Sequence, residues 1–193
     1  DPTGAVLQRL IDRRLMLIEV DRYAPPEPGE AVVNASLAAV ERRFKDALAI
    51  ADDLIARYPR NRVVVLEAGA TAIRARLFAQ ADRVLSEGLT RFATDPRPKA
   101  FGEEAMWYYK RGVARISLGN VAGAQTDLQR AQSLPARSWV KARIRLEQGK
   151  LEDLAGRRDR ALTAYREAMR GAESSNDPST SREAQRLMKS PYR

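Results

Sequence analysis

The stretch GVARISLGNVAGAQTDLQRA, residues 112–131, has a counterpart 37 residues later in GKLEDLAGRRDRALTAYREA, residues 149–168. At this fixed offset the same kinds of residue return in the same order: Gly112 and Gly149, Gly119 and Gly156, Ala124 and Ala161, Leu128 and Tyr165, Ala131 and Ala168. A constant offset of this length is typical of chains built from repeated helical units. We therefore expect the two stretches to fold alike.

Each residue type in this series has a packing reason. Gly112 and Gly149 lie inside a predicted helix, where glycine costs about 1 kcal/mol relative to alanine. Such a cost, repeated, predicts that a neighbouring helix comes too close there for a Cβ atom. Gly119 and Gly156 fall where the first helix of each pair ends, and glycine accepts the left-handed conformation of a helix cap. The small alanine that follows marks a helix crossing, and the bulky residue one turn later fills the space beside it.

Helical patterns continue along the chain, separated by Pro, Gly, Asn and Asp residues. Alanine, leucine, arginine and glutamate dominate these segments, and alternating β-branched runs are nearly absent. The sequence predicts helices at residues 4–22, 30–43, 45–57, 62–76, 79–92, 101–118, 121–133, 138–155, 158–171 and 179–189. The expected fold class is all-α.

Earlier parts of the chain carry weaker copies of the repeat. One unit fits through Gly69, Ala81 and Leu85, and a half-preserved unit fits through Ala47, Ala51 and Pro59. The spacing from Ala81 to Ala124 is 43 residues, which predicts an extension of the chain around residues 94–98.

The series of glycine, cap glycine, small residue, bulky residue and alanine resembles the tetratricopeptide repeat. The resemblance covers about residues 30–171 and is strongest over residues 105–171. Repeats of that family usually have 34 residues, so the last two units here are longer by three. The resemblance implies antiparallel helix pairs stacked into a right-handed solenoid with terminal capping helices. It also implies a non-catalytic scaffold that binds proteins or peptides.

Residues 5–44 are similar to the N-terminal chaperone segment of SurA-type periplasmic prolyl isomerases. The catalytic parvulin domain of those proteins has no counterpart here, so their isomerase activity is not implied. This resemblance suggests an alternative function, a periplasmic, chaperone-like binder of unfolded polypeptides. It would favour the periplasm, and otherwise the bacterial cytoplasm and the periplasm both stay open.

These patterns divide the chain into four parts. Residues 1–24 form an amphipathic helix, residues 25–29 a Pro-rich linker, residues 30–173 the helical repeats, and residues 174–193 a C-terminal capping helix with a tail. Three prolines within four positions, at residues 25–28, end the first helix. Its apolar stripe either caps the array or is exposed for homodimerisation.

Composition excludes several kinds of chemistry. The chain has no histidine and no cysteine, so it contains no Ser-His or Cys-His nucleophile pair and no zinc site of the usual kind. An enzyme or a magnesium site built from carboxylates alone stays formally open, but the acidic residues are interspersed with arginines as in solvated ion pairs. We expect no catalytic residue, no cofactor and no metal. The longest apolar run, residues 15–18, is too short to span a bilayer.

The chain carries 34 basic and 25 acidic residues, a net charge of +9. This excess suggests a nucleic-acid-binding helical repeat as a third function. The basic residues are spread over the predicted helices, without a Lys/Arg block or a Gly-rich phosphate loop, which disfavours that function.

A concave groove lined by the first helix of each pair is the expected binding site. With first helices near residues 62–76, 104–118 and 141–155, the predicted groove residues are Arg74, Met106, Tyr109, Lys110, Ser117, Arg143, Lys150 and Asp153. The basic members of this set favour an acidic peptide or a carboxylate ligand. Buried core or solvated surface is the competing interpretation of the same positions.

Overall fold

The computed structural model describes residues 44–193. In this part of the chain it contains helices and no strand, which confirms the expected all-α class. The predicted helices at residues 4–22 and 30–43, the linker at residues 25–29, the homodimer through the first helix and nearly all of the SurA-like segment lie outside the described residues. The helices are α3 (Phe44–Arg57), α4 (Arg62–Arg74), α5 (Phe78–Thr94), α6 (Glu103–Ser117), α7 (Val121–Ser133), α8 (Ser138–Leu154), α9 (Arg158–Ser174) and α10 (Pro178–Lys189).

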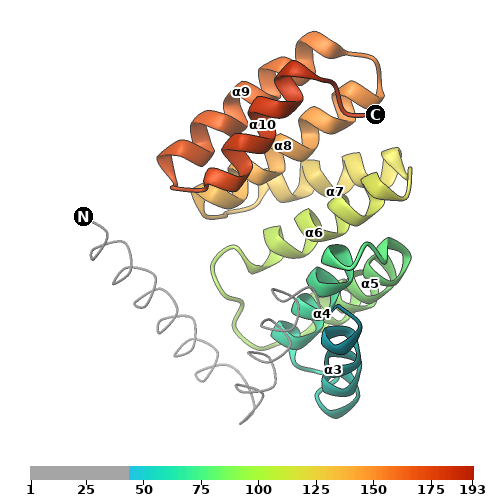
Figure 1. Ribbon diagram of the computed structural model, residues 1–193. Coiled ribbons are helices and arrows are strands. Elements are labelled where there is room, and N and C mark those ends of the chain that lie inside the picture. The colour runs from blue at the N-terminus through green and yellow to red at the C-terminus, as the bar shows by residue number, and fades with distance from the viewer. Residues whose placement is uncertain (1–43) are drawn as a thin grey trace, which may run out of the picture. The chain divides into compact units, whose positions relative to one another are not determined.

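The chain divides into two compact units, residues 1–98 and residues 99–193. In the described part of the first unit, α4 packs against both α3 and α5. In the second unit, α6 pairs with α7 and α8 pairs with α9, while α10 packs on α9 and touches α8 (Figure 1). Consecutive helices therefore form antiparallel pairs, as the repeat predicts.

A helix-interior glycine lies under a bulky side chain of the next helix in three successive pairs. A Cβ atom on Gly149 would stand 2.4 Å from the Tyr165 ring, and one on Gly112 would stand 2.9 Å from Leu128. The same relation holds in the first unit, where a Cβ on Gly69 would stand 2.6 Å from Leu85. Real Cβ contacts are longer than these distances. The expectation that glycine permits a close helix approach is confirmed, and the weaker unit at Gly69 obeys the same rule.

The turn inside each of these pairs takes the left-handed conformation at the same place in the repeat. Gly119 has φ 73° and Gly156 has φ 71°, as expected for glycine at a helix end. The first unit has Arg76 at this place, with φ 61°. A side chain is strained in this conformation by roughly 1 kcal/mol, so the first pair lacks the residue that suits its turn best.

The second unit contains two hydrophobic clusters. One joins α6, α7 and α8 through residues such as Ile116, Leu128 and Ile144. The other joins α8, α9 and α10 through residues such as Tyr165 and Leu187. Helix α8 contributes to both clusters and so forms the centre of this unit.

Most helix bounds lie within two residues of their predicted positions. The largest difference is at α9, which continues to Ser174 instead of ending at residue 171. Its last turn persists because Ala172 is fully buried and the Ser174 and Ser175 hydroxyl groups donate to the Gly171 carbonyl. The chain then turns at Asn176, with φ 54°, and Asp177 caps α10.

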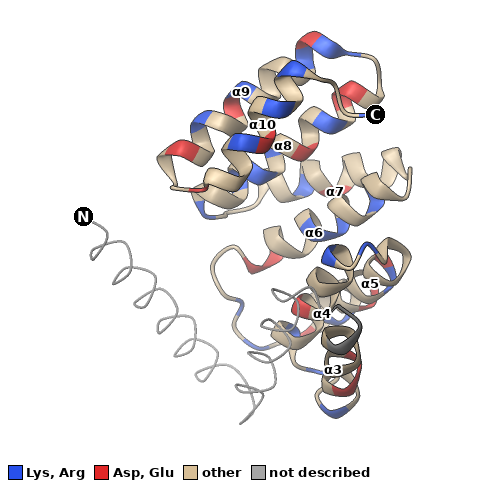
Figure 2. Ribbon diagram, viewed as in Figure 1, with Lys and Arg blue, Asp and Glu red and all other residues tan. Residues whose placement is uncertain are grey.

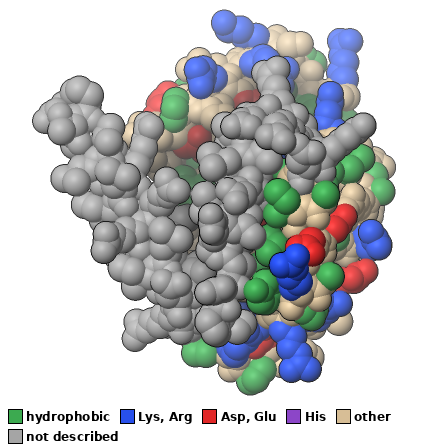
Figure 3. Space-filling model, turned by 60° about the horizontal axis from the view of Figure 1, so that its bottom comes forward, with side chains coloured by type: hydrophobic (Ala, Val, Ile, Leu, Met, Phe, Trp, Pro, Cys, Tyr) green, Lys and Arg blue, Asp and Glu red, His purple; other side chains and the backbone are tan. Residues whose placement is uncertain are grey.

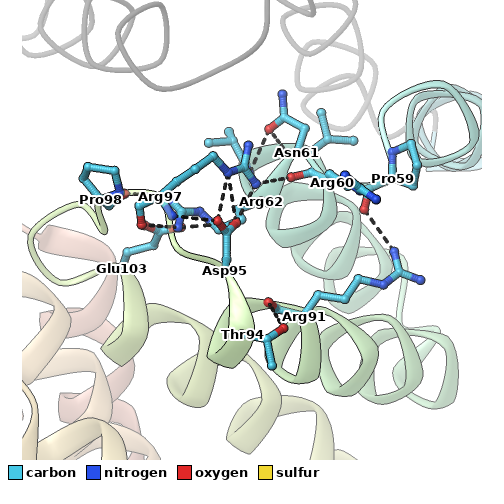
Figure 4. A network of polar contacts seen from close by, with 12 residues as sticks. Pro59, Arg60, Asn61, Arg62, Arg91, Thr94, Asp95, Arg97, Pro98 and Glu103 are labelled. Atoms are coloured by element: carbon cyan, nitrogen blue, oxygen red, sulfur yellow. Dashed lines mark hydrogen bonds and ion pairs between the residues drawn. The ribbon is translucent and has the colours of Figure 1, made fainter.

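The predicted extension after α5 is tied back to the start of α4 (Figure 4). Arg97 donates to the Asp95 carboxylate through both Nε and Nη2, and Arg62 lies 3.6 Å from the same group. Arg62 also donates to the Pro98 carbonyl at 2.6 Å. The hydrogen bond from Arg97 holds the pKa of Asp95 well below its usual range. One carboxylate therefore fixes the path of the extension.

Replacing Gly149 by alanine tests the close approach. Helix propensity alone predicts a gain of about 1 kcal/mol, whereas the clash with Tyr165 predicts a loss of about 1–3 kcal/mol. We expect Gly149→Ala to lower the free energy of unfolding in urea. A leucine at this place would leave the clash, as at Leu85 and Leu128, whereas Tyr165→Ala makes room for a Cβ atom, so the further loss caused by Gly149→Ala should shrink in the Tyr165→Ala background. A stabilised Gly149→Ala chain would contradict the packing argument.

Replacing Asp95 by asparagine tests the extension. The pKa of Asp95 is lower in the folded chain, so its ionisation stabilises the fold above its unfolded pKa near 3.8 and this contribution is lost as the pH falls. We expect Asp95→Asn to lower the melting temperature at pH 7, with the difference narrowing below about pH 4. Asp52→Asn, which changes an exposed carboxylate in the same unit, is the control. If both substitutions lowered the melting temperature equally, the network around Asp95 would contribute nothing to stability.

Candidate functional site

Three neighbouring helices, α6, α8 and α10, form the surface to which the groove prediction points in the second unit. Helix α8 contacts both of its neighbours. We call this surface the α6–α8–α10 face. Its side chains are joined by polar contacts at three points along α8: Arg143, Lys150 and Asp153.

Lys150 lies at the middle of the face and joins α8 to α10. Its Nζ atom lies 2.9 Å from the Glu147 carboxylate and 2.9 Å from the Glu183 carboxylate of α10. Only 11% of its side chain is exposed. Burial lowers the pKa of Lys150, but the two carboxylates outweigh burial and raise the pKa overall. Lys150 therefore remains charged, with its charge neutralised inside the protein.

Glu147 is buried beside this ammonium group. Burial raises the pKa of Glu147, and Lys150 opposes the rise. Burial and the charge of Glu147 also raise the pKa of Tyr109, which reaches this network from α6. The phenol of Tyr109 thus stays neutral and remains a hydrogen-bond donor.

Arg143 lies at the N-terminal end of α8 and reaches the start of α10. Its Nε atom donates to Asp177 at 2.7 Å, and its guanidinium lies 4.7 Å from the centre of the Trp139 ring. Asp177 in turn accepts from Thr180 and caps α10. Burial raises the pKa of Asp177, but the hydrogen bonds from Arg143 and Thr180 outweigh burial, so that the pKa is lowered overall. The Arg143 side chain nevertheless keeps 38% of its surface exposed.

Asp153 forms a buried junction at the C-terminal end of α8. Its side chain is 1% exposed. It accepts two bonds from Arg158 at 3.0 Å, one from the Tyr165 hydroxyl at 2.8 Å and one from the Tyr192 backbone N–H at 2.9 Å. Burial and the bond to Asp153 raise the pKa of Tyr165.

The remaining predicted groove residues lie at several separate places. Met106 and Tyr109 pack against the cluster around Ile116, Lys110 is half-buried on α6, and the exposed Ser117 bonds to a backbone carbonyl of its own helix. Arg74 lies in the other unit, where it is 45% exposed and 3.6 Å from Glu67. The structure thus brings Tyr109, Arg143, Lys150 and Asp153 to one face, and the binding role of the whole set stays a prediction.

Sequence reasoning missed the partners of these residues: Glu147, Asp177, Glu183, Arg158, Tyr165 and Tyr192. One feature of the sequence could have indicated the contact between Asp153 and Tyr165. At the repeat offset of 37, Asp153 replaces Ile116 and Tyr165 replaces Leu128. A tyrosine in a core position needs an acceptor, and an acidic residue had appeared opposite it in the same unit.

Another buried carboxylate, that of Asp127, joins α6 to α7. Asp127 is 1% exposed and accepts a two-point bond from Arg111 at 2.7 and 2.8 Å, as well as one from Arg115 at 2.9 Å. Arg111 also stacks beside the Tyr108 ring. The contacts of Arg111 and Arg115 with Asp127 hold α6 and α7 together.

The described residues contain no cluster of acidic side chains arranged to hold a metal ion. In the same range no helix is long and apolar enough to cross a membrane. Basic side chains are visible at several separate places on the surface in Figure 3.

The helix pairs, their interior glycines and their left-handed turns define a tetratricopeptide-type helical repeat. Comparison with solved structures confirms this fold. A crystal structure of MamA is 21% identical and covers 80% of this chain and 90% of that one, with a TM-score of 0.56. A MamA RS-1 ArsTM double mutant is 15% identical and covers 89% and 93% of the two chains, with a TM-score of 0.58.

The chain is also similar to YrrB, which is described as a TPR protein with an unusual peptide-binding site. The identity is 16%, the match covers 83% of this chain and 86% of that one, and the TM-score is 0.52. At these identities the likeness establishes the fold. No protein-family model and no curated protein matches the chain, and no comparison supports the resemblance to SurA-type segments.

Replacing Lys150 tests whether the centre of the face is a coupled ion pair. Lys150→Met leaves Glu147 buried without its partner, which should cost about 3–5 kcal/mol of unfolding free energy at pH 7. Because burial raises the folded pKa of Glu147, its protonation at lower pH should relieve part of this cost. Urea unfolding at pH 7 and pH 5 measures both effects.

Two variants serve as controls for this measurement. Lys150→Met combined with Glu147→Gln should recover much of the loss, since no buried charge is then left alone. Arg145 lies on the same helix as Lys150 and forms a more exposed ion pair with Glu167 of α9. Arg145→Met removes this pair and should cost less than about 1 kcal/mol. Equal losses for Arg145→Met and Lys150→Met would refute the coupling.

Proposed function

We propose that this chain is a non-catalytic interaction scaffold that binds an acidic peptide or an acidic segment of a partner protein on the α6–α8–α10 face. The observation that carries this proposal is that the Arg143 side chain is held in a fixed position and is still exposed to solvent. Its guanidinium is stacked on Trp139 and oriented by Asp177, yet more than a third of the side chain is exposed. An arginine held in this way binds a further carboxylate with little loss of side-chain entropy.

The distribution of charge supports an acidic partner. Residues 99–193 carry 19 basic and 11 acidic side chains, whereas residues 1–98 carry 15 and 14. Almost the whole net charge therefore belongs to the unit that contains the face, and Figure 2 shows basic residues along α8, α9 and α10. A field of this sign attracts acidic partners and speeds their association.

The internal ion pairs shape this preference. Lys150 is already neutralised by Glu147 and Glu183, so the middle of the face gives little attraction for an anion. Arg143 at one end is the stronger contact point. Exposed arginines on the outer surfaces of α9 and α10, such as Arg166, Arg170 and Arg186, contribute to long-range attraction.

A scaffold role also agrees with how the buried carboxylates are used. Asp127, Asp153 and Asp177 each accept hydrogen bonds from arginine side chains. Groups paired in this way stabilise the fold and are poor general bases. Helical repeats bind extended peptides through many shallow contacts, which makes a peptide the natural class of ligand.

The test compares three tagged chains as baits in an extract of the source cells: the intact chain, Arg143→Ala, and Arg137→Ala. Arg137 is exposed at the start of the same helix, so it is a matched control for charge. We expect an acidic protein to be recovered by the intact chain and by Arg137→Ala. Recovery and measured affinity should fall about tenfold for Arg143→Ala, as for loss of one charge-assisted hydrogen bond.

Circular dichroism and melting temperatures must first show that the three chains are folded alike. Equal recovery by all three would refute the role of Arg143. Broad capture of unfolded polypeptides would instead favour the chaperone-like function, and capture of nucleic acid that falls steeply with salt would favour the third function.

A further inference from the structure

The segment that follows α10, residues 190–193, returns to the α6–α8–α10 face. Of its residues only Tyr192 is half-buried, while Ser190, Pro191 and Arg193 are exposed. We call residues 190–193 the tail segment. Beyond Ser190, whose N–H bonds to the end of α10, it contacts the unit through the side chain and the backbone amide of Tyr192.

Each backbone N–H group from Ser190 to Tyr192 has a hydrogen-bond acceptor. The Ser190 N–H bonds to the Arg186 carbonyl at the end of α10. Pro191 has no N–H, and it favours an extended residue before it. The Tyr192 N–H is then free of secondary structure and donates to Asp153 at 2.9 Å. This is the bond that an extended peptide ligand makes with a scaffold.

The side chain of Tyr192 lies among apolar side chains and beside one cation. It packs against both hydrophobic clusters of the unit, the one with Leu151 and the one with Leu146 and Leu187. The Lys150 ammonium lies 5.5 Å from the centre of the ring, within the range of a cation–π contact. Apolar side chains thus meet the body of the ring, and a charge fixed by two carboxylates meets its face.

Arg158 sets the geometry of this place. It holds Asp153 with one nitrogen, and with another it donates to the Leu187 and Met188 carbonyls at 2.8 and 2.7 Å. The end of α10 and the acceptor for the tail segment are therefore fixed to each other. In the preceding repeat, residues 112–148, the positions equivalent to Arg158 and Asp153 hold Val121 and Ile116, which are apolar. Of these two repeats, only the later one has the polar group that accepts the tail amide.

We propose that Asp153, Lys150 and the apolar side chains around them form a subsite for an aromatic residue of an extended peptide, and that Tyr192 occupies this subsite as an internal ligand. The favoured external ligand is a peptide with a proline followed by tyrosine or phenylalanine, like the sequence at Pro191 and Tyr192. Its amide N–H is accepted by Asp153 and its ring lies beside Lys150. The inference rests on the proposed function and names a ligand class and a competitor for the same face.

An internal ligand reduces the apparent affinity for an external one. A linked segment competes at an effective concentration in the millimolar range. If the tail segment occupies the subsite nine-tenths of the time, its removal strengthens the binding of an external peptide about tenfold. An external peptide therefore enters the subsite only when the tail segment leaves it.

The test measures the fluorescence anisotropy of a labelled peptide with the sequence of residues 188–193 on three full-length chains. Tyr192→Ala removes the internal ring, Tyr192→Phe keeps it, and the intact chain is the reference. We expect Tyr192→Ala to bind the peptide about tenfold more tightly than the intact chain and Tyr192→Phe to resemble the intact chain. A peptide with alanine in place of its tyrosine should not bind. Equal affinities for all three chains, or binding that ignores the aromatic residue, would overturn the proposal.

A second measurement locates the peptide without relying on a variant of the buried Asp153. A peptide with a photoreactive phenylalanine at the tyrosine position should crosslink to α8 and α10 of Tyr192→Ala, near Lys150 and Leu187. Crosslinks confined to α9 or to the first unit would contradict the subsite. The Arg143-dependent partner is measured on Tyr192→Ala as well. If that partner still binds while the peptide does not, the subsite is wrong and the proposed scaffold function stands.

Discussion

The fold depends on the contact between a helix-interior glycine and a bulky side chain of the next helix. Gly69 with Leu85, Gly112 with Leu128, and Gly149 with Tyr165 are each separated by sixteen residues, and each glycine lies too close to its partner for a Cβ atom. This contact sets how closely two antiparallel helices approach. The small alanines at the helix crossing fit the same close approach, and the left-handed turn ends the first helix of each pair so that the chain can reverse.

The last of these contacts also explains where the polar chemistry of the second unit lies. A tyrosine in place of leucine fills the same place in the core but adds a hydroxyl group, which donates a hydrogen bond to Asp153. A buried carboxylate then needs a positive partner, which Arg158 supplies. Arg158 in turn holds the end of α10. One change of core residue is thus linked to a network that reaches the surface of the α6–α8–α10 face.

The sequence predicted the helices well because their periodicity, caps and interior glycines are local signals. It also named Tyr109, Arg143, Lys150 and Asp153 as members of a common surface, since they share one side of the first helices. It did not identify Glu183, Asp177 or Tyr192 as their partners. Those contacts depend on the rotation of α10 against α8, which is fixed by packing between residues more than thirty positions apart. A side chain predicted to face a ligand can equally face a carboxylate of its own chain.

The 37-residue series that places glycine at positions 112 and 149 places Arg186 at the next position. Its side chain is 64% exposed on α10. A helix that carries arginine at this place cannot accept a further partner helix at the same close distance. A helix pair inserted between α7 and α8 would bring its own glycine and its own bulky partner, so it can lengthen the array. A second helix added directly after α10 would instead pack against Arg186, so extension at that end needs glycine at position 186.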